Sequence, residues 1–338
     1  MPDSLPIHVV ADWQTQLREA IVSAQQLLDM LSLTADQVGF SEQASEDFPL
    51  KVPVAFARRM RAGDPADPLL RQVLASTEET HEVPGYLRDP VGETGSANPK
   101  QGIIHKYHGR ALLLVTSACA INCRYCFRRH FPYEENQNSR LQWRETLAYI
   151  GRDESIEEVI LSGGDPLVAN DRLLRDLCSQ IAAFPHVRRL RIHSRLPIVL
   201  PDRVTPGLLD AIVQPSLQTV MVVHSNHANE MDAGVCDAVS AMRERGITVL
   251  NQAVLLKGVN DSVNALVDLS ESLFAAGILP YYLHLLDKVE GAAHFDLPEL
   301  RARQLMAEVA ARLPGYLVPR LVREEAGANA KTGIAFSH

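Results

Sequence analysis

The sequence lacks the features that would place this protein outside the cell or within a membrane. It has only 5 cysteines in 338 residues, too few and too clustered for a disulfide framework, so we expect the reducing conditions of the cytoplasm. No apolar run approaches the ~18–20 residues that a membrane span requires. The start of the chain has no basic stretch followed by an apolar core, so we predict no secretory leader.

The chain also lacks an excess of positive charge. It contains 33 Lys and Arg against 41 Asp and Glu, which gives a net charge of -8 at pH 7. This balance disfavours sequence-independent contact with nucleic acid, so we expect no nucleic-acid partner. With 46% hydrophobic and 22% charged residues, the composition is that of a globular protein long enough to bury a large core.

Three of the cysteines lie close together, with the spacing C-x3-C-x2-C, directly after the apolar run Ala111–Val115. The three are Cys119, Cys123 and Cys126. An iron–sulfur cluster normally takes four cysteine ligands, so a set of three would leave one iron open to bind another molecule. The alternative is a structural zinc site, which needs a fourth ligand. Candidates for that ligand are His105, His108 and His130. The cysteine spacing favours the cluster.

Residues 1–100 are expected to form a helical and irregular region. Trp13 to Leu31 carries apolar residues at helical spacing, with Asp12 as its predicted N-cap. A short helix is predicted within Pro53–Arg61. Pro, Gly and Asp dominate Asp64–Pro68 and Pro84–Pro99, which predicts loops.

From residue 110 onward, short β-rich runs alternate with amphipathic helical stretches. The predicted strands are Ala111–Val115, Glu158–Leu161, Arg189–His193, Thr219–Val223, Thr248–Val254 and Leu279–His284. The helical patterns lie near Leu141–Ile150, Asp171–Phe184, Thr205–Val213, Asn229–Arg245, Asp261–Ala276 and Leu297–Leu313. Such alternation predicts parallel βαβ units. A full eight-fold barrel typically takes ~250 residues, so we predict an α/β fold with a partial (β/α)6 barrel over 101–314, followed by a C-terminal segment, 315–338. Cys178 and Cys236 fall within the helical patterns and are predicted to be buried free thiols.

Polar residues lie at or just beyond the C-terminal end of every predicted strand, except that Asn251 and Gln252 lie within the fifth strand. Ligands of parallel α/β sheets gather at that edge. Besides the cysteine loop, the segments are Ser162–Pro166, His193–Arg195, His224–His227, Asn251–Gln252 and His284–Asp287. A turn or a cap could explain any one of them, but together they predict a ligand site.

The cysteine motif CAINCRYCF, together with ILSGGDPL, RIHSRLPIVLP, HSNHANE, NQAVLLKGVND and GYLVP, resembles the radical S-adenosylmethionine (SAM) superfamily and, within it, the lysine 2,3-aminomutase family. The match runs from about His105 to Thr332. It implies a [4Fe-4S] cluster on the three cysteines, SAM on the open iron, and pyridoxal 5'-phosphate (PLP) held as a Schiff base by a lysine. Lys331 occupies that position, although in isolation it would more often be a solvated lysine. The family's poly-Gly stretch before this lysine is replaced here by Gly327–Ala330, and its Thr-Pro by Thr332-Gly333.

The resemblance also implies roles for individual residues. Arg128, two positions past the third cysteine, matches the arginine for the substrate carboxylate, a pairing that a guanidinium makes with two hydrogen bonds. Asp287 and Glu324 match two acids that hold the far ammonium group of lysine, the second being Asp in the free-lysine enzymes. The residues expected near PLP are Tyr107, Arg110 and Lys106, the last replacing an Arg. Those expected at SAM or in the same cavity are Gly163, Gly164, Asp165, His224 and Gln252.

The reaction implied is the transfer of the amino group of L-lysine from its α to its β carbon. Cleaving an unactivated C–H bond is left to cofactors, and an electron donor is needed. The segment DPLLRQVLAS…VPGYLRDPVGE, and the position of Lys331 seven residues before His338, resemble a shorter bacterial branch. Its (R)-β-lysine is attached to elongation factor P by a separate ligase. The alternatives are a free-lysine aminomutase making (S)-β-lysine, a PLP-independent radical SAM enzyme acting on RNA, and a zinc-stapled interaction module. The sequence leaves the choice between monomer and homo-oligomer open.

Overall fold

The computed structural model describes residues 12–94, 97–98, 102–132 and 140–336. Within these residues the chain forms one nine-stranded sheet whose strands follow their order in the sequence. The strands are β1 Ile103–Tyr107, β2 Arg110–Thr116, β3 Glu158–Gly163, β4 Arg189–Ser194, β5 Gln218–Val223, β6 Thr248–Val254, β7 Leu279–His284, β8 Arg320–Arg323 and β9 Thr332–Gly333. Strands β2 to β8 are parallel to their neighbours, while β1 and β9 pair antiparallel at the two edges.

All six predicted strands are therefore confirmed, and the open parallel sheet confirms the partial barrel. Strands β1, β8 and β9 were not predicted from the sequence. Strand β1 ends in His-Lys-Tyr, β8 has only four residues between two arginines, and β9 has two residues. None of them carries a run long enough to register as a buried strand.

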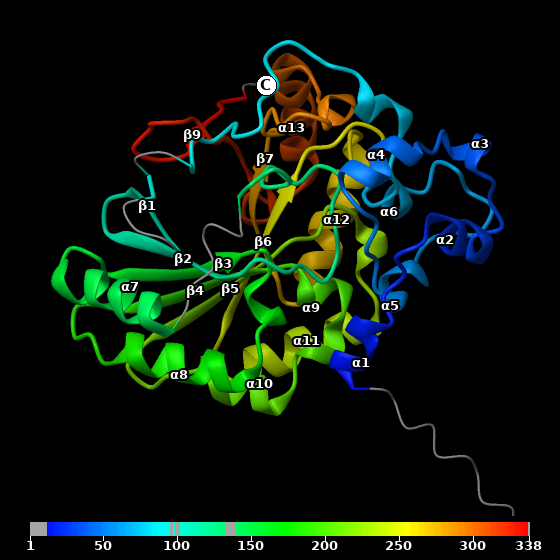
Figure 1. Ribbon diagram of the computed structural model, residues 1–338. Helices are drawn as coiled ribbons and strands as arrows, with labels where there is room; N and C mark the ends of the chain where they lie inside the picture. Colours follow the sequence, from blue (N-terminus) through cyan, green and yellow to red (C-terminus); the bar gives the residue numbers. More distant parts are fainter. Residues whose placement is uncertain (1–11, 95–96, 99–101, 133–139, 337–338) are drawn as a thin grey trace, which may run out of the picture.

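Helices connect the parallel strands and cover the outside of the sheet (Figure 1). They are α7 Arg140–Arg152, α8 Asp171–Ala182, the short α9 Leu196–Val199, α10 Pro206–Ile212, α11 Ala233–Glu244, α12 Val263–Ala275 and α13 Glu299–Arg312. Side chains of Asn170, Thr205, Asp232 and Ser262 cap the N-termini of α8, α10, α11 and α12, which fixes where each helix begins. Helix α11 packs on β6, α12 on β7, and α13 on α12.

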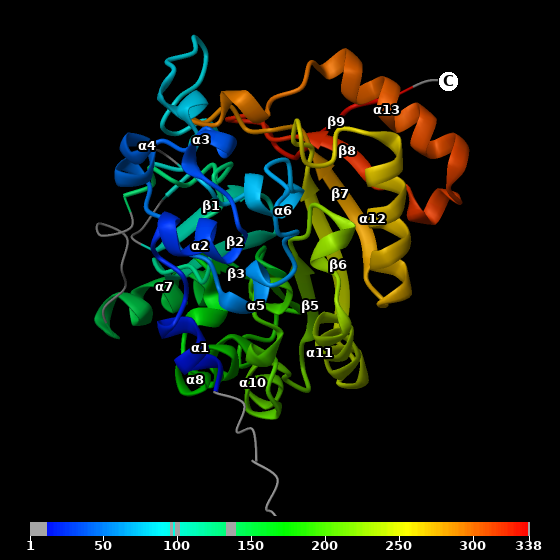
Figure 2. The same ribbon diagram turned by 90° about the vertical axis from the view of Figure 1, so that its right-hand side faces the viewer.

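Among the described residues before the barrel, six short helices lie together on one side of the molecule, away from α7 (Figures 1 and 2). They are α1 Trp13–Arg18, α2 Ala24–Met30, α3 Ala35–Val38, α4 Glu42–Asp47, α5 Val54–Ala57 and α6 Pro68–Arg71. Asp12 caps α1 as predicted, with its Oδ1 accepting from Thr15 N at 2.7 Å. The helical pattern over Trp13–Leu31 does not form one helix, because Ile21 leaves it to pair its backbone with Val52.

The N-terminal helices share one hydrophobic core with the barrel. Leu27, Phe56 and Leu69 belong to the same buried cluster as Leu113 and Ile192. The proposed boundaries at residues 100 and 314 therefore cross a continuous core, and the three-part division stays a prediction.

The two cysteines outside the motif have different surroundings. Cys178 is buried, as predicted, but Cys236 is exposed. Helix α11 buries Val235, Val239 and Met242 instead. Cys236 follows Val235 directly and points away from that face, since successive helical residues differ by about 100°.

Side chains bridge the opening between the two ends of the sheet. The Tyr107 hydroxyl at the end of β1 donates a hydrogen bond to Glu324, which follows β8. Lys106 Nζ lies 3.6 Å from Oε1 of the same carboxylate. The partial barrel is thus joined at its open side by polar contacts rather than by strand pairing.

The structure bears on the prediction of no membrane span but not on that of no secretory leader. No helix among the described residues is both long and apolar enough to cross a membrane. The start of the chain, on which the prediction of no secretory leader rests, lies largely outside the described residues.

Candidate active site

A cavity of about 700 Å³ opens at the C-terminal ends of the parallel strands. Every residue predicted for the site lines it, although these residues are spread over more than 200 positions of the chain. They are Lys106, Tyr107, Arg110, Cys119, Cys123, Cys126, Arg128, Gly163, Gly164, Asp165, His224, Gln252, Asp287, Glu324 and Lys331. The fold thus brings the predicted set together, while the role of each member stays a prediction.

The N-terminal region holds the cysteine loop in place. Lys51 Nζ donates to the Cys119 carbonyl at 2.8 Å, and its own carbonyl accepts from Asn122 N at 3.0 Å. Arg124 N donates to the carbonyl of Gln72 at 2.9 Å. The residues between the cysteines are therefore anchored outside the barrel, which explains why the region before residue 100 packs where it does.

The Arg124 side chain also ties the cysteine loop to the N-terminal region. It is fully buried, and its Nε and Nη2 donate to the Glu79 carboxylate at 2.8 and 2.6 Å. Its Nη2 also donates to the carbonyl of Ala44 at 2.8 Å. Removing one partner of such a buried pair typically costs ~3–5 kcal/mol, because the other charge stays buried and unpaired.

The cysteine side chains suit a shared metal cluster. Burial first, and then repulsion from Cys123, raise the pKa of Cys126 to about 11, and burial likewise raises the pKa of Cys119. Their thiolates gain stability once a cation shares the site. Among the described residues, no three His, Cys, Asp or Glu side chains converge tightly enough for one metal ion. A cubane cluster makes no such demand, since each cysteine binds a different iron.

The two glycines after β3 allow the sheet edge to touch the cysteine loop. Gly163 has φ +123°, and a Cβ there would lie 2.5 Å from the Thr116 carbonyl oxygen. A Cβ on Gly164 would lie 2.4 Å from the carbonyl oxygen of Ala118. In the structure these two glycines therefore allow the end of β3 to contact the backbone that leads into the cysteine loop.

Gly164→Ala is expected to destabilise the fold by ~1–3 kcal/mol or more, because the added methyl meets rigid backbone. Urea unfolding measures this loss, and iron content after reconstitution should fall with it. Gly315→Ala is the matched control, since nothing lies within 4 Å of its Cβ position. Equal unfolding midpoints for the two variants would contradict the packing argument.

Asp165 joins the end of β3 to the end of β4. Its Oδ2 accepts from the backbone N–H groups of Arg195 and Leu196 at 2.8 and 3.1 Å. Its Oδ1 accepts from Ser194 Oγ at 2.7 Å and Leu167 N at 3.0 Å. Burial raises the pKa of this carboxyl, although these hydrogen bonds oppose the shift. In this structure Asp165 therefore organises the backbone around the cavity.

Arg128 has a carboxylate partner that the sequence analysis did not foresee. Its Nε and Nη2 form a two-bond pair with Glu93, at 2.6 and 3.0 Å. Its Nη1 donates to Ser162 Oγ and to the Gly163 carbonyl, at 3.0 and 3.2 Å. Glu93 is itself buried and lies 3.7 Å from Lys106 Nζ.

Lys331 lines the same cavity as the cysteine loop and lies in the segment leading into β9. Its Nζ donates to Glu324 Oε2 at 2.7 Å and stands 5.9 Å from the centre of the Tyr282 ring. Burial alone would raise the pKa of Glu324, but Lys331, Tyr107 and Lys106 together hold that pKa below its usual value. A second carboxyl, Asp287, lines the same cavity, and burial raises its pKa to about 7.

Several buried polar atoms around this cavity have no hydrogen-bond partner among the described residues. They are Arg110 Nε and the Nε2 atoms of His193, His224 and His284. Burial lowers the pKa of His224 to about 4 and lowers those of His193 and His284. The imidazoles are therefore neutral near pH 7, and a bound cofactor could satisfy them and the arginine.

Comparison with known proteins agrees with this site. Residues 113–269 match the family model of the Radical SAM superfamily. L-lysine 2,3-aminomutase from Escherichia coli (strain K12) is 49% identical, over 96% of this chain and 94% of that protein. The chain belongs to the lysine 2,3-aminomutase family. A relative of the same name from Haemophilus influenzae is 45% identical, over 98% of each chain.

A third relative of that name, from Clostridium subterminale, is 30% identical, over 96% of this chain and 77% of the relative. Among solved structures, "Native anSMEcpe with bound AdoMet" has a TM-score of 0.44 and 10% identity, over 60% of this chain and 58% of that one. A structural likeness of this size adds nothing to the family assignment.

Membership in the lysine 2,3-aminomutase family makes the chain an isomerase that works with a [4Fe-4S] cluster and SAM. The three cysteines at one wall of the cavity fit the cluster. The family also works with PLP, and the unpartnered Arg110 Nε and the amine of Lys331 in the same cavity suit its phosphate and aldehyde groups. The zinc and RNA-modifying alternatives are set aside by this assignment.

Some residues of the site escaped the sequence analysis. Glu93 lies in a segment whose Pro, Gly and Asp content predicted only a loop. Arg195 was noted only as a polar strand end, yet it contacts Cys123. The sequence shows only that each residue is charged. It does not show that Glu93 pairs with Arg128, 35 positions away, or that Arg195 contacts Cys123, 72 positions away.

Proposed function

We propose that this family member converts L-lysine to (R)-β-lysine, which a separate ligase attaches to elongation factor P. The observation that carries the lysine assignment is one cavity with Lys331 beside Asp287 and Glu324, and with Arg128 next to the cysteine loop. Support for the shorter branch comes from identity: 49% and 45% to two relatives matched over nearly their full length, against 30% to the longer Clostridium relative.

The cofactors would supply the radical chemistry. The cluster and SAM would provide a radical that abstracts hydrogen, and PLP would bind the migrating nitrogen. Cys119, Cys123 and Cys126 would hold the cluster, and Lys331 would carry PLP. Arg110 and Lys106 would face its phosphate, and Tyr107 its ring. Gly163, Gly164, Asp165, His224 and Gln252 would line the part of the cavity that takes SAM.

Charge explains how the cavity would select lysine. Asp287 and Glu324 would surround the far ammonium group, which offsets its desolvation and rejects amino acids that lack it. Glu324 already holds one ammonium, that of Lys331, at 2.7 Å. With its amine committed to PLP, Lys331 would leave this carboxylate to the substrate ammonium. Glu324 is one methylene longer than the Asp of the free-lysine enzymes.

The substrate carboxylate would take over part of the Arg128 guanidinium that Glu93 occupies. Glu93 would keep Lys106 as a cationic partner, since the two already lie 3.7 Å apart. Glu93 would then share Lys106 with the PLP phosphate, while Arg128 would serve the substrate carboxylate, so neither carboxylate would be left without a cation in this buried site.

The pKa of Asp287, about 7, predicts a pH dependence of lysine capture. Burial favours the protonated carboxyl below this value, and only the ionised form above it attracts the substrate ammonium. The kcat/KM for lysine should therefore rise between pH 6 and pH 8, and this rise should vanish in Asp287→Asn. Asp210→Asn, which alters an exposed carboxylate on α10, should keep it. An unchanged profile in Asp287→Asn would remove Asp287 from the substrate site.

The product decides between the branches. Anaerobic, reconstituted protein is given L-lysine, SAM, PLP and dithionite, and the products are resolved by chiral chromatography. (R)-β-lysine is expected. The S enantiomer would make the chain a free-lysine aminomutase instead, and SAM cleavage without β-lysine would mean that the substrate is not lysine.

The proposal also sets the cellular context. An oxygen-sensitive cluster and unpaired cysteines require reducing conditions, so we place the enzyme in the cytoplasm. It would need a protein electron donor there. Its link to elongation factor P would run through the product, which the ligase consumes.

A further inference from the structure

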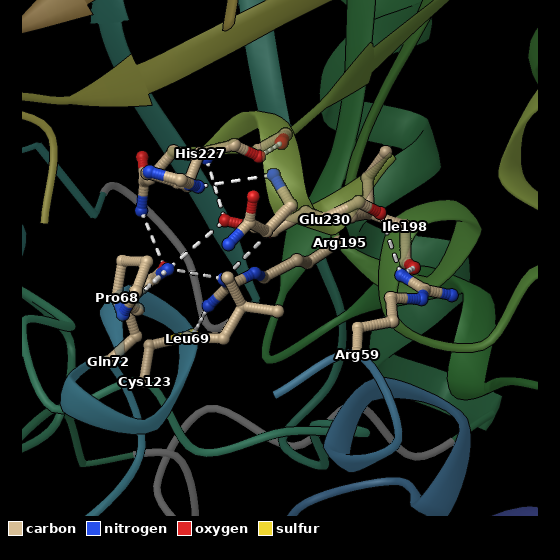
Figure 3. Close-up of polar contacts among 12 residues, drawn as sticks. Arg59, Pro68, Leu69, Gln72, Cys123, Arg195, Ile198, His227 and Glu230 are labelled. Carbon is tan, nitrogen blue, oxygen red and sulfur yellow. Dashed lines mark hydrogen bonds and ion pairs between the residues drawn. The ribbon is translucent and has the colours of Figure 1, made fainter. Parts of the chain in front are cut away.

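The guanidinium of Arg195 lies against one of the three cluster cysteines. Its Nη1 donates to Cys123 Sγ at 2.8 Å (Figure 3). Arg195 follows β4 directly, and its side chain is only 6% exposed. A buried cation in contact with the sulfur of a cluster ligand therefore comes from a different strand end than the cysteine loop.

Two side chains hold this guanidinium in place from the other side. Nη2 of Arg195 donates to Gln72 Oε1 at 2.6 Å and to Glu230 Oε2 at 3.1 Å. Gln72 Nε2 in turn donates to Glu230 Oε1 at 3.1 Å, closing a ring of contacts visible in Figure 3. The centres of the Phe56 and Tyr125 rings lie 5.4 and 5.7 Å from the guanidinium carbon of Arg195.

The supporting residues are themselves fixed by backbone contacts. Asn226 N donates to Glu230 Oε1 at 2.9 Å, and Gln72 Nε2 donates to the Pro68 carbonyl at 3.1 Å. The backbone N–H of Arg195 is bound by Asp165. The guanidinium is a permanent cation, because an arginine side chain stays protonated in proteins.

A fixed cation and an N–H donor at a cluster sulfur have a known physical effect. Reduction adds one negative charge to the cluster, and both the cation and the hydrogen bond stabilise that charge. The effect is strong because the surroundings are buried. We propose that Arg195 is a positioning residue that raises the reduction potential of the cluster through Cys123, and that Gln72 and Glu230 set its geometry. The N-terminal region, which supplies Gln72, thereby takes part in the electron-accepting step.

This inference needs only the cluster that the family assignment provides, and neither lysine nor PLP enters its test. The full chain is reconstituted anaerobically and titrated with dithionite and redox mediators, without SAM, while electron paramagnetic resonance follows the reduced cluster. The main variant is the double substitution Arg195→Gln with Glu230→Gln, which removes both charges of the buried pair and keeps side chains of similar size.

The midpoint potential of the double variant is expected to fall by at least about 59 mV, which is a tenfold change in the ratio of reduced to oxidised cluster for a one-electron couple. Arg195→Lys keeps the charge but cannot reproduce the planar set of donors, so it should shift the midpoint in the same direction by less. Arg59→Lys is the control. Arg59 donates to the Glu230 carbonyl at 2.8 Å and pairs with Asp232, and this variant should leave the midpoint unchanged.

Each result bears on the proposal. An unchanged midpoint in the double variant, at wild-type iron content, would overturn it. If the double variant does not retain its iron, Arg195→Lys decides: a midpoint equal to that of the wild type overturns the proposal, and a lower one supports it. A shift of equal size in Arg59→Lys would also overturn it, because the cause would then be general loosening of the network.

Discussion

Cys126→Ala is expected to abolish the visible absorbance of the reconstituted cluster and to reduce SAM cleavage to background. Two cysteines cannot replace three, since each ligates a different iron and the fourth iron must stay open for SAM. Cys126 lines the cavity beside Arg128. The measurements are iron and sulfide content, the absorption spectrum, and release of 5'-deoxyadenosine in the presence of dithionite.

Cys178→Ala provides the matched control. Cys178 is fully buried, on α8, and does not line the cavity. Its loss removes one buried sulfur from the core, so a modest loss of stability is expected, with the cluster and SAM cleavage retained. If Cys126→Ala kept a full complement of iron and cleaved SAM at the wild-type rate, the cluster ligands would have to be assigned elsewhere.

Lys331→Met is expected to eliminate β-lysine formation while the cluster stays intact. The substitution keeps the length of the side chain and removes the amine that would bind PLP. It also removes the ammonium that neutralises Glu324. The direct measurement is reduction of the PLP-loaded protein with borohydride, followed by peptide mass spectrometry to locate the cofactor. Wild-type protein should carry it on Lys331, and the variant should carry none.

Lys288→Met tests the specificity of this effect. Lys288 is exposed and stands near the Tyr86 ring, 5.9 Å from its centre. Its replacement should leave both PLP capture and β-lysine formation unchanged. Covalent PLP on another lysine of the wild-type protein, or β-lysine formation by Lys331→Met at the wild-type rate, would show that the C-terminal segment does not carry the cofactor.

The barrel could be predicted from the sequence because its signals are local. Each central strand is a short apolar run such as Glu158–Leu161, and helices such as α8 have a capping residue and a clear apolar face. The N-terminal region was harder, because its helices are short and their ends depend on distant partners. Ile21 leaves the helical pattern to pair with Val52, 31 positions later. Local spacing contains no information about such a contact.

The sequence alone determined the family and the parallel order of the strands, and it predicted the cysteines for the cluster and the lysine for PLP, since each depends on residue type, spacing or motif. Tertiary structure decided which charges meet. It paired Arg128 with Glu93, Lys331 with Glu324, and Arg195 with Cys123. The reason is physical: parallel strands bring their C-terminal ends to one edge, and burial there leaves each charge only the partners that the fold places within reach.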